Sequence, residues 1–135
     1  MIFLDTSFLV AYSHEKDENH EKALELMKDI AKGKYGKLCV SDYIFDETVT
    51  VVFARTKKLE EAVKIGEKLI DGTGILDIDD FLFDMSWDIF KNQKDSEFSF
   101  TDCTTISAMI KIRIANIATF DKEFKKIKNI NVIPE

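Results

Sequence analysis

Proline, glycine and cysteine are scarce in this chain. Its 135 residues include one proline, five glycines and two cysteines. Long linkers are usually rich in glycine or proline, so we expect one domain over residues 1–135, with a sizeable core. Cys39 and Cys103 form no CxxC pair, and Cys39 lies in an apolar run. This pattern predicts reduced core cysteines of an intracellular protein.

The sequence also lacks the hydrophobic segments that direct a chain to a membrane. No apolar run approaches the length of a membrane-spanning helix. The first residues contain no basic segment followed by an apolar one, which is the pattern of an export signal. We therefore expect a cytoplasmic protein with no membrane association.

The charge of the chain is unevenly distributed. The net charge is −6, with 45% hydrophobic and 33% charged residues, as in ordinary globular proteins. A negative net charge counts against a nucleic-acid partner, because Lys and Arg drive phosphate binding. Seven cations nevertheless form two clusters: Arg55, Lys57 and Lys58, and Lys122, Lys125, Lys126 and Lys128. Each cluster can be a solvated face or part of a basic rim around an acidic centre.

Short apolar runs alternate with segments of helical periodicity. The runs predict strands over residues 2–4, 37–40, 75–78, 117–119 and 130–133. The periodic segments predict helices over residues 7–12, 19–33, 42–53, 59–70, 81–90 and 101–114. This alternation is typical of a three-layer α/β/α fold with a parallel five-stranded sheet. Right-handed crossovers favour the strand order 3-2-1-4-5, which places a ligand crevice between the first and fourth strands.

Four acidic residues are expected to lie near this crevice. Asp5 ends the first predicted strand, and Asp121 follows the fourth. Asp102 lies in the first turn of the helix before the fourth strand, and Glu47 lies in the apolar helix after the second. Four carboxylates in one cavity repel each other, by roughly 4 kcal/mol for a pair about 4 Å apart at an effective dielectric near 20.

A hard cation would neutralise this set of carboxylates. Oxygen ligands without a His or Cys cluster favour Mg²⁺, or Mn²⁺, over Zn²⁺. We therefore interpret Asp5 as a buried metal ligand, with Ser7 or Thr6 holding its oxygens in place.

Each acid also has a purely structural interpretation. Asp5 and Asp121 can cap the helices that follow them, and Asp102 can be a first-turn acid favoured by the helix dipole. Glu47 is the hardest to explain structurally, because its helix is apolar on nearly all sides, although Asp46 beside it is a competing candidate.

Four sequence segments resemble the motifs of the PIN-domain nucleases. "FLDTSFLVA" is similar to the first motif and contains Asp5, and "SDYIFDETV" is similar to the second and selects Glu47 over Asp46. "FSFTDCTTISA" resembles the third motif with Asp102, and "IATFDKEF" resembles the fourth with Asp121 and a supporting hydroxyl at Thr119. The resemblance covers the whole chain, and the compact size is similar to that of VapC toxins of type II toxin–antitoxin pairs.

The resemblance implies a Mg²⁺-dependent endoribonuclease with a PIN-like fold. Asp5, Asp102 and Asp121 would bind the metal directly or through water, and Glu47 would position or deprotonate the attacking water. Arg55 and Lys122 are candidates for steering the phosphate backbone. The family further implies a homodimer and a small inhibitory antitoxin of the VapB type.

Other classes of protein fit the sequence less well. A haloacid-dehalogenase phosphatase needs a second Asp two residues after the first, where this chain has Ser7. A receiver domain has its acids in a different order along the strands. A non-catalytic PIN-fold module, binding RNA or protein in an RNA-processing complex, stays open as the alternative.

Overall fold

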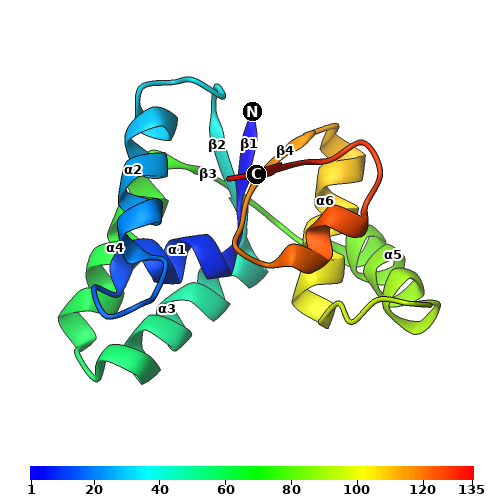
Figure 1. Cartoon of the computed structure of the whole chain (residues 1–135). Coiled ribbons are helices and arrows are strands. Elements are labelled where there is room, and N and C mark those ends of the chain that lie inside the picture. Colours follow the sequence, from blue (N-terminus) through cyan, green and yellow to red (C-terminus); the bar gives the residue numbers. More distant parts are fainter.

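A parallel five-stranded sheet organises the chain, as the computed structural model of residues 1–135 shows (Figure 1). The strands are β1 (Ile2–Leu4), β2 (Leu38–Ser41), β3 (Gly74–Leu76), β4 (Asn116–Ala118) and β5 (Asn131–Ile133). The helices are α1 (Thr6–Ser13), α2 (His20–Ala31), α3 (Asp42–Thr56), α4 (Leu59–Gly72), α5 (Asp80–Lys91), α6 (Phe100–Ile112) and the short 3₁₀ helix η1 (Lys122–Lys126). The predicted elements are therefore all present.

The strand order is β3-β2-β1-β4-β5, which confirms the predicted topology. β1 is the central strand, with Phe3 in register with Cys39 of β2 and with Ile117 of β4. The residues of β1 are 0–1% exposed, because helices cover both faces of the sheet. The switch in strand order falls between β1 and β4, so the crevice predicted from the sequence opens beyond the carboxyl ends of these two strands.

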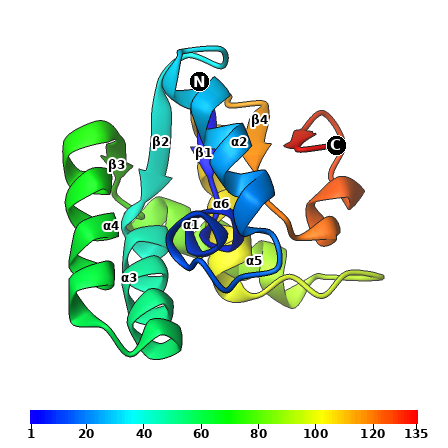
Figure 2. The ribbon, with the colours of Figure 1, turned by 60° about the vertical axis from the view of Figure 1, so that its left-hand side comes forward.

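The helices form two layers around the sheet. In Figure 1, α1, α2 and α4 lie on one side of the sheet, and α5 and α6 lie on the other. The view in Figure 2, turned by 60°, shows α3 running away from the sheet beyond the end of β2. The ends of β1, β2 and β4, the start of α1 and the start of α3 are thus all at one end of the molecule.

Side-chain caps fix where several helices begin. Ser41 accepts a hydrogen bond from the amide of Ile44 at the start of α3, and Asp79 accepts one from Leu82 in α5. Ser99 and Asp102 form a reciprocal capping box at the start of α6. Of the two caps considered for each helix, Ser41 and Ser99 are the ones used. The predicted strand limits are shifted by one or two residues at β3 and β4, so Thr119 lies just beyond β4.

A single cluster of 26 buried residues forms the hydrophobic core. Both cysteines are free and buried, as predicted. Phe98 belongs to this core and its ring lies 5.5 Å from that of Phe124, whereas Phe100 packs among aromatic side chains of α3 and α5. None of the helices has both the length and the apolar character that crossing a membrane requires.

Candidate active site

Asp5 is buried at the end of β1, with 3% of its surface exposed. It precedes α1, but its side chain makes no capping hydrogen bond to that helix, so the capping interpretation is wrong. Instead its Oδ2 accepts hydrogen bonds from the hydroxyls of Ser7, at 2.9 Å, and Thr119, at 2.6 Å. Ser7, rather than Thr6, therefore holds this carboxylate, and the hydroxyl of Thr6 has no partner.

The same two hydroxyls connect the ends of β1 and β4. The Ser7 hydroxyl accepts a hydrogen bond from the amide of Phe120, and the Thr119 hydroxyl accepts one from the amide of Asp121, each at 3.0 Å. Both hydroxyls donate to Asp5 and accept from the chain after β4. This arrangement fixes the carboxylate of Asp5 relative to the backbone of Asp121.

Asp102 and Asp121 each use one oxygen in a helix cap. Oδ2 of Asp102 accepts from the amide of Ser99 at 3.0 Å, and Oδ1 of Asp121 accepts from the amide of Glu123 at 2.9 Å. The capping interpretations are thus correct for these oxygens. The other oxygen of each carboxylate makes no hydrogen bond within the chain and stays open to a ligand.

Glu47 lies in α3 and is partly buried, while Asp46 beside it is exposed. The side chain of Glu47 forms neither a hydrogen bond nor an ion pair with the protein. It lines the same cavity as Asp5, whereas Asp46 does not. The structure therefore favours Glu47 of these two acids as the member of the site.

One cavity of about 490 Å³ brings the four predicted acids together. Asp5, Glu47, Asp102 and Asp121 all line it, although they come from four parts of the chain. The wall is completed by Thr6, Ser7, Val10, Asp17, Glu18, Asn19, Val51, Arg55 and Phe120. The predicted crevice at the ends of β1 and β4 is thus a real cavity with a strongly acidic lining.

The loop between α1 and α2 forms part of this wall, which the sequence did not indicate. The segment around Glu15 to Glu18 was expected to be a solvated loop, but Asp17 and Glu18 line the cavity. The carboxylate of Asp17 accepts from the amide of Asn19 and lies 3.7 Å from the guanidinium of Arg55. Asp17 and Arg55 are far apart in the sequence, so no local pattern could have paired them.

The electrostatics of the site reflect burial and mutual repulsion. Burial raises the pKa of Asp5, against the opposing effect of the Thr119 and Ser7 hydroxyls, and the charge of Glu47 raises it further. Burial is also the main cause that raises the pKa of Asp102 to about 6, with the charges of Asp5 and Asp121 adding to it. The acids are therefore close enough to influence each other's ionisation.

The donor chemistry of this cavity fits a hard divalent cation. Four carboxylates supply oxygen donors, and two of them keep an oxygen free of hydrogen bonds. In the positions seen, no three His, Cys, Asp or Glu side chains are arranged to hold one metal ion together. Water-mediated contacts are common for Mg²⁺, which keeps several of its own waters when bound to protein. The set therefore fits Mg²⁺ or Mn²⁺ in its chemistry.

The family of the chain follows from its sequence as a whole. The family model for the PIN domain matches residues 2–130. The chain belongs to the PIN-domain family. This assignment confirms the resemblance carried by the four acidic motifs.

Two curated PIN proteins illustrate what the chain is similar to. It is 27% identical over 135 residues, which is all of both chains, to the 23S rRNA-specific endonuclease VapC20 of Mycobacterium tuberculosis. It is 26% identical over 128 residues to a VapC ribonuclease of Archaeoglobus fulgidus, covering 90% of this chain and 77% of the relative.

Solved structures give the same picture of the fold. The crystal structure of M. tuberculosis VapC20, described as a sarcin–ricin loop cleaving toxin, has a TM-score of 0.83 at 26% identity, and the match covers 93% of this chain and 94% of that one. VapBC2 from Rickettsia felis, bound to a DNA fragment of its promoter, has a TM-score of 0.69 at 21% identity, covering 98% and 97% of the two chains. This PIN domain therefore has the fold of the VapC proteins.

Proposed function

We propose that this PIN domain is a metal-dependent endoribonuclease that hydrolyses phosphodiester bonds of RNA. The observation that carries the proposal is that four carboxylates from four elements line one cavity at the ends of β1 and β4. The similarity to VapC20 and to the A. fulgidus VapC ribonuclease supports RNA as the substrate.

In this proposal Asp5, Asp102 and Asp121 hold Mg²⁺, directly or through water, and Mn²⁺ can replace it. When bound, the ion lowers the pKa of a water molecule and offsets negative charge that develops on the phosphate. Ser7 and Thr119 hold the Asp5 carboxylate in one orientation. Glu47 makes no hydrogen bond within the chain, which leaves it free to orient or deprotonate the attacking water.

We further propose that the protein forms a homodimer and binds a small VapB-type antitoxin. The R. felis structure with the same fold is described as VapBC2, which supports an antitoxin partner. Exposed apolar side chains on α5 and α6 support a second copy of the chain: Phe81, Phe83, Trp87 and Ile110 are 45–63% exposed. Size-exclusion chromatography with light scattering distinguishes the dimer from a monomer.

The decisive experiment for the activity is an RNA cleavage assay. End-labelled RNA, including a fragment with the sarcin–ricin loop named for VapC20, is incubated with the protein in Mg²⁺, in Mn²⁺ and in EDTA. We expect cleavage with either metal, none in EDTA, and products that carry a 5′-phosphate and a 3′-hydroxyl. A protein that cleaves equally well in EDTA contradicts the metal requirement.

Two variants make the assay specific for the acidic cavity. Asp5→Asn keeps an acceptor for Ser7 and Thr119 but removes the charge, and we expect it to abolish cleavage. Asp46→Asn is the matched control, because Asp46 is exposed beside Glu47 and does not line the cavity. If no RNA is cleaved under any condition although the protein binds RNA, the alternative of a non-catalytic PIN-fold module replaces this proposal.

A further inference from the structure

A groove that contains three lysines adjoins the acidic cavity. It has a volume of about 370 Å³ and shares four lining residues with that cavity: Glu18, Asn19, Phe120 and Asp121. Lys22, Lys122 and Lys125 also line the groove, and none of them lines the acidic cavity. A chain with a net charge of −6 thus places three cations directly beside its acidic centre.

The lysines come from two elements that are distant in the sequence. Lys22 belongs to the first turns of α2, and Lys122 and Lys125 belong to η1, which begins directly after Asp121. Residues three positions apart in a 3₁₀ helix lie on the same face, so Lys122 and Lys125 lie on one face of η1. The short helix that presents an acid to the cavity therefore presents two cations to the groove.

The ammonium groups of these lysines are not engaged by the protein. None of the three forms an ion pair, although Glu18 and Glu135 also line the groove. Lys126 of the same helix is different, because its Nζ lies 2.9 Å from the carboxylate of Glu123 and donates to the carbonyl of Asp95. η1 thus has one lysine that serves the fold and two that stay open to an anion.

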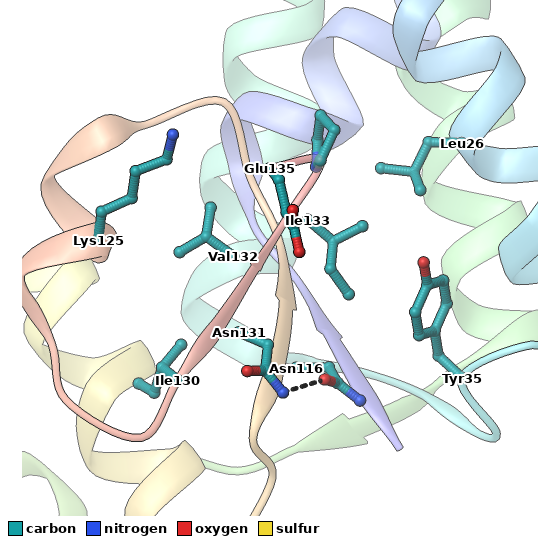
Figure 3. A pocket seen from close by; sticks show the side chains of 10 residues that line it. Leu26, Tyr35, Asn116, Lys125, Ile130, Asn131, Val132, Ile133 and Glu135 are labelled. Carbon is teal, nitrogen blue, oxygen red and sulfur yellow. Dashed lines mark hydrogen bonds between the residues drawn. The ribbon is translucent and has the colours of Figure 1, made fainter.

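The groove continues into a larger cavity of about 710 Å³ at the edge strand β5. The two share Lys125, Val132, Pro134 and Glu135. Figure 3 shows Lys125 at one side of this cavity and Tyr35 at the other, with Asn116 and Asn131 hydrogen-bonded below them. An extended ligand that starts in the acidic cavity can therefore follow the surface past the lysines to polar and aromatic groups at β5.

We propose that the RNA strand that leaves the acidic cavity lies in this groove, with its phosphates bound by Lys22, Lys122 and Lys125. The inference rests on the proposed nuclease function, since it identifies where the substrate of that site extends. A single strand suits the arrangement, because it carries one phosphate per nucleotide along a continuous path. An isolated phosphate would use only part of a groove that continues to β5.

The test measures RNA binding without cleavage and compares two triple variants. Both are made in the Asp5→Asn background, with labelled single-stranded RNA in Mg²⁺. The first is Lys22→Gln/Lys122→Gln/Lys125→Gln. The second removes the same charge at Lys28, Lys64 and Lys128, which are exposed and do not line the groove. Thermal melting verifies that both variants are folded.

The expected result concerns the dependence of affinity on salt. Each lost phosphate contact on a single strand lowers the slope of log affinity against log salt by about 0.7, so the groove variant loses a slope of about 2. The matched variant keeps the slope of the parent. A much shorter RNA that does not reach beyond the acidic cavity binds the groove variant and its parent equally.

Other outcomes overturn the inference. If both triple variants lose the same slope, the effect is one of net charge, and the path is refuted. If the groove variant binds RNA like its parent but no longer binds polyglutamate, the groove serves an acidic protein instead. The outcome is separable from that of the nuclease proposal: a protein that cleaves RNA independently of these lysines keeps its function but loses this path, and one that binds RNA through them without cleaving it keeps the path alone.

Discussion

The hydroxyl of Thr119 donates a 2.6 Å hydrogen bond to Oδ2 of Asp5, across 114 positions of the sequence. The Ser7 hydroxyl lies 3.0 Å from that of Thr119 and donates to the same oxygen. Oδ2 is thereby satisfied within the protein, and Oδ1 is the oxygen that stays free of hydrogen bonds. These two hydroxyls determine which oxygen of Asp5 is available to the cavity.

Removing the Thr119 hydroxyl should impair catalysis more than folding. We expect Thr119→Val, which has nearly the same shape, to lower metal affinity or cleavage by about 10- to 100-fold, as losses of this kind do around metal ligands. Titration of cleavage rate against Mg²⁺ concentration measures the effect. Thr119→Ser keeps the hydroxyl and should retain most of the activity; a Val variant as active as the wild type would contradict the positioning role.

The raised pKa of Asp102 predicts that the metal-free protein is less stable when this group is ionised. Between the ordinary Asp pKa of 3.8 and the folded value of about 6, the folded state binds more protons than the unfolded state. Stability therefore falls as pH rises through this window.

The variant Asp102→Asn tests this effect, because its amide oxygen can still accept from the amide of Ser99. In EDTA at pH 7.5 we expect it to raise the free energy of unfolding by about 1 kcal/mol, since it removes a charge whose burial is unfavourable. Urea unfolding at pH 4 and at pH 7.5 measures the difference. At pH 4 the gain should disappear, and a gain of equal size at both pH values would indicate another cause.

Binding of a divalent ion should stabilise the protein. At a Mg²⁺ concentration about tenfold above the dissociation constant, the expected gain is about 1.4 kcal/mol, which corresponds to a few degrees in Tm. Thermal melts in Mg²⁺ and in EDTA measure it. Asp5→Asn should show little of this shift and Asp46→Asn all of it, whereas an equal shift in both variants would place the ion elsewhere.

Phe124 links the stability of η1 to the position of Asp121. Its ring is fully buried and lies 5.5 Å from that of Phe98. We expect Phe124→Leu to cost about 1 kcal/mol of stability through imperfect repacking, and to lower cleavage as well, because η1 begins at Asp121.

The matched control for this change is Phe81→Leu. Phe81 is 63% exposed on α5, so its replacement should change stability by less than about 0.5 kcal/mol. Urea unfolding and the RNA cleavage assay measure both variants. A Phe124→Leu protein with lower stability but full activity would separate the packing of η1 from the site.

The sequence by itself determined the elements and their order. Apolar runs and helical periodicity located all five strands, and the handedness of crossover connections favoured the strand order that the structure has. Because Asp5 and Asp121 directly follow neighbouring strands, their placement at one end of the sheet could also be predicted. These inferences succeed because they depend on local patterns and on rules of chain connection.

Only the tertiary structure decided how the side chains are used. It showed that Ser7 and Thr119 share one oxygen of Asp5, that Asp17 pairs with Arg55, and that the loop after α1 closes the cavity. It also joined Lys22 to the lysines of η1 in one groove. Such contacts depend on rotamers and on the path of loops between residues far apart in the chain, and no periodicity in the sequence encodes them.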